Sequence, residues 1–152
     1  MNFTIKSQLK SIGNNAFEKT AIEAILFPST LESIGEYAFF MCSKLRTVQN
    51  FSKQINFGMK SFSRSSIEKI TFPPKAVFSD SSFEGCMNLK SIKFSEKPIN
   101  IIFESYSFGF CGLESIHIED NDGNITFHEN VFANCPNLKS VFLHQKNAGE
   151  LT

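Results

Sequence analysis

The chain has 152 residues, a formal net charge of zero, and 41% hydrophobic against 20% charged residues. This balance fits an ordered chain with a real core and excludes the low hydrophobicity and high net charge of a disordered one. Zero net charge also excludes a global field that would draw the chain to nucleic acid or anionic lipid.

The sequence opens on residues that match the second half of a later segment. The aligned pairs are Phe3 with Ile25, Ile5 with Phe27, Leu9 with Leu31 and Ile12 with Ile34. The same opening has no charged start followed by an apolar block, so we expect no signal peptide there. No stretch approaches the roughly 18 apolar residues of a membrane span, so we expect no transmembrane segment in this chain.

A pattern of 21 to 25 residues recurs along the chain, and residues 31–51 show it most completely. An apolar residue is followed five positions later by phenylalanine, and three positions after that by cysteine, serine or threonine. The recurring phenylalanines are Phe17, Phe39, Phe62, Phe83, Phe108 and Phe132. Self-similarity at this period is typical of a leucine-rich-repeat solenoid. We therefore predict one domain over residues 1–152, with about six repeats that are partial at both ends.

Each repeat contains one short stretch in which apolar and polar residues alternate with a period of two, as in a half-buried strand. The predicted strands are residues 3–5, 25–27, 48–50, 70–72, 92–94, 116–118 and 141–143. Asn50 breaks the apolar pattern, and Phe51 is the alternative occupant of its buried place. Because each connection is a coil of about 20 residues, successive strands must pair in parallel.

Around each recurring phenylalanine we predict a short helical or 3₁₀ turn, preceded by a second short extended stretch such as residues 101–103. The rings are expected to form a structural core ladder, in which each stacked pair contributes roughly 0.5–1.5 kcal/mol beyond area burial. The predicted fold class is a leucine-rich-repeat solenoid, α/β but mostly β. It is a right-handed coil with one parallel sheet of about seven short strands and short helical or 3₁₀ turns.

The recurring positions of the repeat resemble those of the BspA-like (type 5) leucine-rich repeats. The resemblance extends from Phe3 to Leu143. The resemblance rests on the small residue before each phenylalanine, the cysteine, an L-x-x-I segment and a strand often ended by proline. Thr20 and Ser65 depart from it at the cysteine column. Such repeats occur in surface proteins of bacteria and parasitic protists, and several members are implicated in adhesion. The resemblance implies a non-catalytic interaction scaffold at the cell surface, with a host-cell or matrix protein as partner.

Two alternatives stay open beside this interpretation. An intracellular leucine-rich-repeat scaffold, located in the cytoplasm, would fit free thiols and the missing signal peptide. A structural spacer in a longer repeat array would fit the repeats equally well. End-to-end self-association is also compatible with the sequence, because solenoids need polar caps and neither terminus supplies an obvious one.

No catalytic, cofactor-binding or metal-binding residues are predicted. The histidines His117, His128 and His144 lack a nucleophile and an orienting carboxylate in one cleft. Residues 119–129 partly match an EF-hand loop, but its first ligand would be Ile118, a buried strand residue, and flanking helices are absent. The matching positions are Asp120, Asp122, Gly123 and Glu129. A tight Asp-Gly turn explains this stretch better than calcium binding.

The four cysteines, Cys42, Cys86, Cys111 and Cys135, occupy one column of the repeat. Side chains in one column point the same way rather than at each other, which strains a disulfide. Tetrahedral zinc ligands must converge on a point, whereas these lie along a line. We therefore predict buried free thiols that behave as small hydrophobic groups.

The outward surface of the predicted strand sheet is the candidate partner-binding surface, called here the strand face. Along one rim the charges alternate in sign at Glu23, Arg46, Glu68, Lys90, Glu114 and Lys139. Opposite charges on adjacent strands leave no net field, whereas a phosphate backbone needs an uncompensated basic stripe, so we predict no nucleic-acid partner. The column at the strand centres has no single character, as in a recognition surface. Its members are Leu26, Gln49, Thr71, Lys93, His117 and Phe142.

Overall fold

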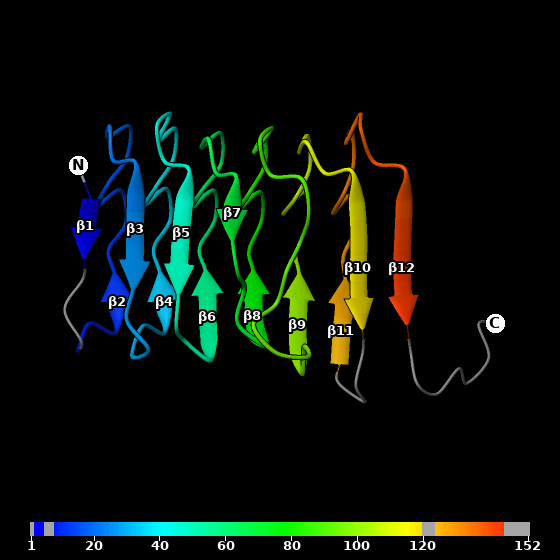
Figure 1. The fold of residues 1–152 in the computed structure, drawn as a ribbon, viewed down its shortest axis with the longest axis horizontal. Helices are drawn as coiled ribbons and strands as arrows, with labels where there is room; N and C mark the ends of the chain where they lie inside the picture. Colours follow the sequence, from blue (N-terminus) through cyan, green and yellow to red (C-terminus); the bar gives the residue numbers. More distant parts are fainter. Residues whose placement is uncertain (1, 5–7, 120–123, 145–152) are drawn as a thin grey trace.

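The computed structural model describes residues 2–4, 8–119 and 124–144, which form a parallel β-solenoid (Figure 1). Its front sheet has two parts, β1-β3-β5-β7 and β10-β12, and its second sheet has the order β11-β9-β8-β6-β4-β2. The front strands are β1 (Asn2–Thr4), β3 (Ala24–Phe27), β5 (Thr47–Asn50), β7 (Lys69–Ile70), β10 (Ser115–Glu119) and β12 (Ser140–His144). The second-sheet strands are β2 (Ser11–Ile12), β4 (Ser33–Ile34), β6 (Gln54–Phe57), β8 (Lys75–Phe78), β9 (Asn100–Phe103) and β11 (Asn124–Phe127).

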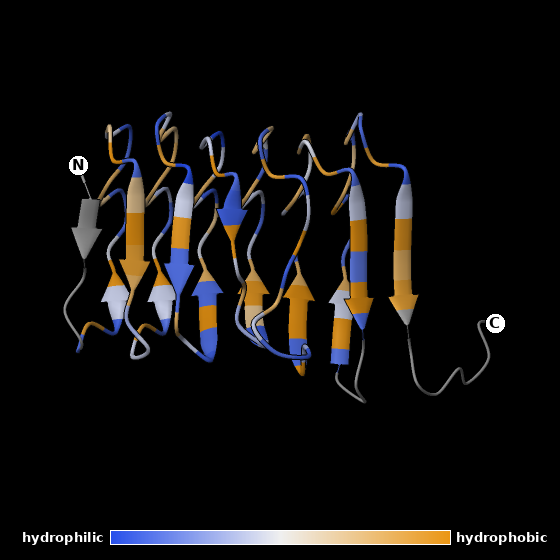
Figure 2. Ribbon diagram, in the orientation of Figure 1, coloured by the Kyte–Doolittle hydropathy of each residue, from blue (hydrophilic) through white to orange (hydrophobic). Residues whose placement is uncertain are grey.

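The parallel front strands follow from the period-two pattern of each repeat. In β10 the order is Ser-Ile-His-Ile-Glu, and Ile116 and Ile118 are buried while His117 and Glu119 are exposed. The bands of hydropathy along β10 in Figure 2 show the same alternation. The second extended stretch expected before each phenylalanine is confirmed, and it forms a complete parallel sheet of its own, with Phe57 paired to Phe78 and Phe78 to Phe103.

The front sheet departs from the predicted run of about seven strands at residues 92–94, where we expected a strand. In the described residues this segment makes only two isolated bridges, Phe72 to Phe94 and Ser91 to Ser115. Pro73 and Pro74 follow Phe72, and a proline has no N–H to donate to a ladder. The ladder therefore does not continue beyond Phe72 between these coils, and the front sheet falls into its two parts.

The predicted helical or 3₁₀ turns are wrong, because the described residues contain no helix. Each turn instead carries two residues with positive φ, four positions apart, as at Asn15 (58°) and Lys19 (56°). Alternate N–H groups then point to different partners. Ala16 donates to the Gly13 carbonyl within its own turn at 3.4 Å, whereas Phe17 donates to the Ala38 carbonyl of the next coil at 2.8 Å. A helix would direct its N–H groups along its own axis and forfeit the bonds between coils.

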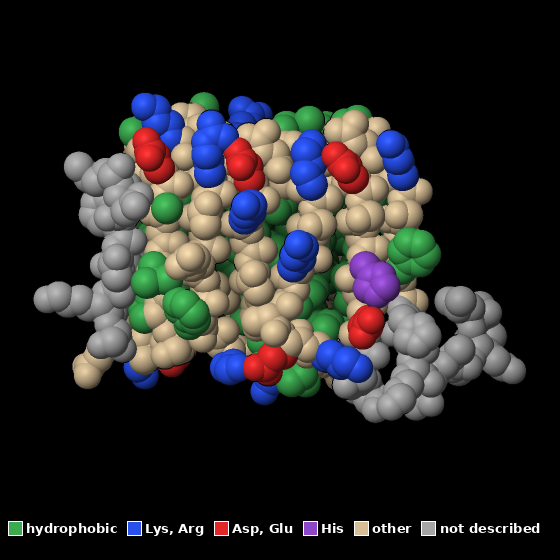
Figure 3. All heavy atoms as spheres, in the orientation of Figure 1, with side chains coloured by type: hydrophobic (Ala, Val, Ile, Leu, Met, Phe, Trp, Pro, Cys, Tyr) green, Lys and Arg blue, Asp and Glu red, His purple; other side chains and the backbone are tan. Residues whose placement is uncertain are grey.

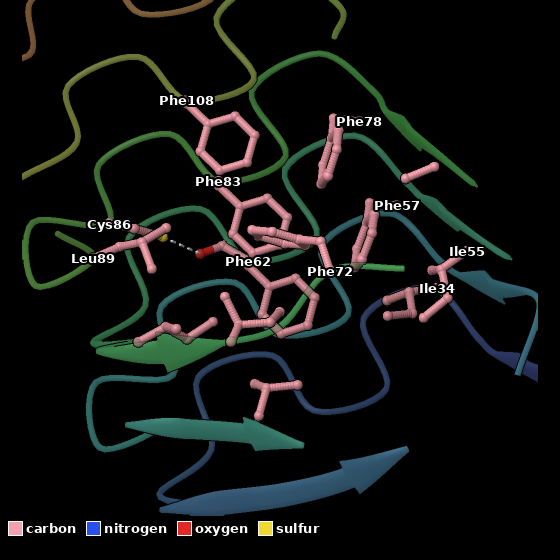
Figure 4. Packing of buried hydrophobic residues seen from close by; sticks show 14 of the residues in the cluster. Ile34, Ile55, Phe57, Phe62, Phe72, Phe78, Phe83, Cys86, Leu89 and Phe108 are labelled. Atoms are coloured by element: carbon pink, nitrogen blue, oxygen red, sulfur yellow. Dashed lines mark hydrogen bonds between the residues drawn. The ribbon is translucent and has the colours of Figure 1, made fainter. Parts of the chain in front are cut away.

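The recurring phenylalanines follow one another along the inside of the coil, and Figure 4 shows three of them, Phe62, Phe83 and Phe108, stacked in this order. Ring centroids are 5.1 Å apart for Phe17–Phe39, 4.7 Å for Phe39–Phe62, 4.9 Å for Phe62–Phe83, 5.2 Å for Phe83–Phe108 and 6.1 Å for Phe108–Phe132. A second ladder from the second sheet has spacings of 5.0, 5.0 and 4.9 Å along Phe57, Phe78, Phe103 and Phe127. Phe72 of the front sheet meets both ladders edge-on. One apolar core therefore ties both sheets and the turns together.

Candidate functional site

The alternation of burial along the strands places the strand-centre column on the outward surface of the front sheet, which Figure 3 views from the front. Leu26 pairs in register with Gln49, and His117 pairs with Phe142. Thr71 and Lys93 lie one residue before the bridged pair Phe72 and Phe94. Gln49, Lys93, His117 and Phe142 are exposed, while Leu26 and Thr71 are half-buried. The structure therefore places all six candidate residues along one surface that crosses the strands.

Two hollows open on the strand face, at and beside the gap in the front sheet. The first, of about 440 Å³, is lined by Lys93, Phe94, Lys97 and His117 among others. The second has a volume of about 470 Å³ and is lined by different residues. These include Gln49, Phe51, Lys69, Thr71 and Ser95. The first hollow therefore lies where the pairing of the front sheet is interrupted, and the second lies beside it, over β5 and β7.

The charges on the two rims of the strand face are paired. On the predicted rim, Arg46 pairs with Glu68, and Lys90 Nζ lies 3.8 Å from Glu114 Oε1. On the opposite rim the ion pairs are Lys53–Glu96 and Lys97–Glu119 at 3.9 Å, and Glu119 also lies 3.4 Å from His117 of the strand centre. All of these side chains are well exposed, so each pair contributes little to stability. Their effect is to neutralise both rims.

Lys69 and Lys93 differ from the rim cations. Both are exposed, and neither has a carboxylate partner within 4.0 Å among the described residues. They come from neighbouring coils and lie between the two rims. The centre of the strand face thus carries positive charge that its own acids do not balance.

Two aromatic side chains project from the strand face. The exposed fraction is 61% for Phe51 and 59% for Phe142. The Phe142 ring lies 5.9 Å from the His117 ring, centroid to centroid. The alternative that Phe51 fills the buried place of Asn50 is wrong, because the Asn50 side chain holds that place by accepting from Ser52 N at 3.0 Å and donating to Thr71 O at 3.4 Å. Sequence reasoning therefore missed Phe51 and Lys69 as members of the surface.

The other candidate sites do not assemble in the described part of the chain. His128, which directly follows β11 of the second sheet, lies 3.7 Å from Glu104, whereas the His117–Glu119 pair lies on β10 of the front sheet. Among the described residues, no three His, Cys, Asp or Glu side chains are placed to hold a metal ion. Asp120, Asp122 and Gly123 of the calcium-like loop, and the His144 side chain, lie outside the described residues. No described helix is long and apolar enough to cross a membrane.

The four cysteines are free, and their thiols are built into the turns. Each Sγ donates to the carbonyl of the recurring phenylalanine in the preceding coil. The distances are 3.0 Å for Cys42–Phe17, 3.2 Å for Cys86–Phe62, 3.1 Å for Cys111–Phe83 and 3.2 Å for Cys135–Phe108. At the two departures from the column, the Thr20 and Ser65 hydroxyls lie 3.6 and 3.5 Å from the thiol of the next coil. A hydroxyl can therefore replace the thiol without breaking the column.

The thiols are expected to be unreactive in the folded chain. Burial raises the pKa of Cys42 and Cys135. The pKa of Cys111 is raised well above its usual value, mainly by its hydrogen bond with Cys86 and also by burial. A disulfide reagent at about pH 8 should then label them slowly until urea unfolds the chain, with the half-buried Cys135 first. Stability should fall as the pH rises past about 9, because the unfolded thiols of Cys42, Cys111 and Cys135 lose protons that the folded ones keep. At Cys86 burial acts to raise the pKa, but the hydrogen bonds with Cys111 and Ser65 lower it, so this thiol opposes the change.

Treatment with a reductant is the control for this prediction, because it tests whether the cysteines form disulfides. Free thiols require that dithiothreitol leave the melting temperature unchanged, and a clear drop would reveal disulfides instead. Rapid labelling of all four thiols in the folded chain would contradict the buried hydrogen-bonded arrangement.

Comparison with known proteins agrees with this architecture. A family model described as the BspA type leucine rich repeat region matches in six copies over residues 1–79 and 57–149. The chain belongs to the BspA-type leucine-rich-repeat family. Solenoids of this family are generally non-catalytic, and their repeats suggest a scaffold for protein interaction. No curated protein matches the chain in a sequence search.

Two solved structures resemble this BspA-type chain. A leucine rich cell surface protein from Faecalibacterium prausnitzii A2-165 aligns with a TM-score of 0.57 and 19% identity, over 95% of this chain and 48% of that one. A leucine-rich repeat protein from Bacteroides ovatus aligns with a TM-score of 0.37 and 20% identity, over 95% of this chain and 63% of that one. The first similarity shows the shared fold. This chain spans about half the length of the Faecalibacterium protein.

Proposed function

We propose that this chain is a protein-recognition scaffold that binds its partner through the strand face. The observation that carries the proposal is the pair of hollows on that face, flanked by the exposed rings of Phe51 and Phe142. Exposed aromatic side chains beside a concave surface are typical anchors of protein interfaces. The uncompensated Lys69 and Lys93 add a means of selecting partners by charge.

The proposed setting is the cell surface, in adhesion to a host-cell or matrix protein. Two findings support it: the BspA-type family and the similarity in fold to a cell surface protein of Faecalibacterium prausnitzii. In this role the solenoid holds the strand face rigid through its stacked core, because a preformed surface loses little conformational freedom on binding. The residues proposed to contact the partner are Leu26, Gln49, Thr71, Lys93, His117 and Phe142, with Phe51 and Lys69 added.

The second candidate function is that of a spacer coil in a longer array, or of a unit that associates end to end. The last coil favours it, because Val141 and Leu143 of β12 are 49% and 53% exposed. Their register partners Ile116 and Ile118 in β10 are 0% and 2% exposed. An additional coil, or the end of a second molecule, would bury these apolar side chains. Size-exclusion chromatography with light scattering separates a monomer from such an assembly.

Binding to immobilised matrix and host-cell surface proteins tests the leading proposal. We expect saturable binding by surface plasmon resonance, and a loss of affinity on the order of tenfold in the double variant His117→Ala/Phe142→Ala, because anchor truncation typically costs 1–2 kcal/mol or more. The matched control is Asn56→Ala/Asn100→Ala on the second sheet, where both side chains are also exposed. Partner binding that both double variants leave intact would place recognition away from the strand face.

A further inference from the structure

We infer that the two hollows form one continuous site for an extended acidic peptide segment of the partner, with apolar side chains at both ends of the segment. This inference rests on the proposed function of the strand face and specifies the chemistry of what the face binds. Three features of the surface carry it: the charge at its centre, the distance between its aromatic ends and the neutrality of its rims.

The charge at the centre selects acidic residues. The exposed Lys69 and Lys93 lie between the rims without a carboxylate partner among the described residues. The nearby acids are already engaged. Glu68 pairs with Arg46, Glu96 with Lys53, Glu114 with Lys90, and Glu119 with Lys97 and His117. A partner carboxylate would therefore gain two lysines without displacing an existing ion pair.

The aromatic ends set the length of the bound segment. Phe51 follows β5, and Phe142 lies on β12, four coil intervals further along the front sheet. At about 4.8 Å between neighbouring strands this separation is roughly 19 Å. An extended peptide advances about 3.3 Å per residue, so about six residues running across the strands would reach from one ring to the other. Acidic residues in the middle of such a segment would lie over Lys69 and Lys93.

The hollows give the segment a place to lie. The first is lined by Lys93 and His117, and the second by Lys69, Thr71 and Phe51. The first lies over residues 91–98, where the pairing of the front sheet is interrupted, and the second lies beside it, over β5 and β7, and reaches Ser95. Side chains of a peptide that alternate in direction can enter each hollow in turn.

The neutral rims argue for a peptide rather than a polyanion such as a sulfated glycan. A polyanion binds through many contacts along an uncompensated basic stripe. Here the rim cations are paired with acids and only two central lysines are unbalanced. The exposed rings at the two ends, 61% and 59% exposed, offer apolar contacts that a sulfated sugar would not use.

Fluorescence anisotropy with synthetic peptides tests this inference. The probe is a fluorescein-labelled peptide with Phe or Leu at both ends and Glu and Asp between, and its matched analogue has Gln and Asn in place of the acids. We expect saturable binding of the acidic peptide that weakens at least tenfold in Lys69→Glu/Lys93→Glu. Binding should also weaken several-fold between about 0.05 and 0.5 M salt, because exposed charges are screened. Lys75→Glu, an exposed lysine of the second sheet, should change the affinity less than twofold.

A milder variant guards against misfolding. Lys69→Gln/Lys93→Gln removes the charge but keeps an unbranched polar side chain that is one atom shorter, and it should lose several-fold in affinity while retaining the melting temperature. Equal binding of the acidic and neutral peptides would overturn the inference, as would binding of a heparin oligosaccharide in place of the peptide. Absence of peptide binding, when surface proteins still bind through His117 and Phe142, would also overturn it but leave the proposed function standing. The proposed function itself fails only if the strand-face variants do not affect the binding of partner proteins.

Discussion

Replacing Phe83 by alanine is expected to lower the free energy of unfolding by about 3–5 kcal/mol. Phe83 has no exposed surface, and its ring is stacked between those of Phe62 and Phe108 at 4.9 and 5.2 Å. It also meets rings of the front and second sheets edge-on. These are Phe57, Phe72 and Phe78. The substitution therefore removes buried area and opens a cavity where both ladders meet.

Urea denaturation followed by circular dichroism measures this loss. Phe51→Ala is the matched control, because the same truncation at a ring that is 61% exposed should change stability by no more than about 0.5 kcal/mol. Phe132→Ala should fall between the two, since its ring is only half-buried and lies 6.1 Å from Phe108 at a tilt of 35°. Similar losses at Phe51 and Phe83 would mean that the ladder does not hold the coils together.

The strands of the front sheet could be predicted because each repeat position has a fixed environment. At β10, apolar Ile116 and Ile118 alternate with His117 and Glu119, and the period alone identifies the buried side. The turns could not be predicted in the same way. Residues such as Tyr37 (φ 56°) and Met41 (φ 54°) adopt the left-handed region, which their residue types do not favour. Bonds to the neighbouring coil stabilise that conformation, and a single repeat does not reveal them.

The candidate site shows the same division between local pattern and three-dimensional context. The column through Gln49, Lys93 and His117 follows from repeat spacing, and the structure places these residues together on one surface. The hollow beside Lys93 and His117 depends on the gap in the front sheet between β7 and β10, where the described residues make only isolated bridges, and no single repeat reveals that gap. Phe51 was missed because whether it or Asn50 faces the core is decided by the Asn50 side-chain hydrogen bonds.

Replacing Gly112 by alanine is expected to destabilise the chain by about 3 kcal/mol or more, through overpacking against backbone. A Cβ at this position would lie 1.8 Å from the Met87 carbonyl oxygen and 2.7 Å from its carbon. Neither coil can yield easily, because Gly112 N donates to Cys86 O at 3.3 Å and Met87 N donates to Gly85 O at 2.9 Å. Relieving the clash must break the Gly112–Cys86 bond, which joins the two coils, or the Met87–Gly85 bond within one turn.

Gly13→Ala provides the control for Gly112→Ala, because a Cβ there would meet no atom within 4 Å. The same added methyl group at Gly13 should change stability by less than about 1 kcal/mol, since its main effect is on the freedom of the unfolded chain. Thermal melts and urea titrations of the two variants measure this difference in stability. If both were neutral, the close approach of residues 111–113 to the Met87 carbonyl would not be a feature of the folded chain. If only Gly112→Ala is destabilised, the spacing between coils at the turns is fixed by backbone contact as well as by the aromatic ladder.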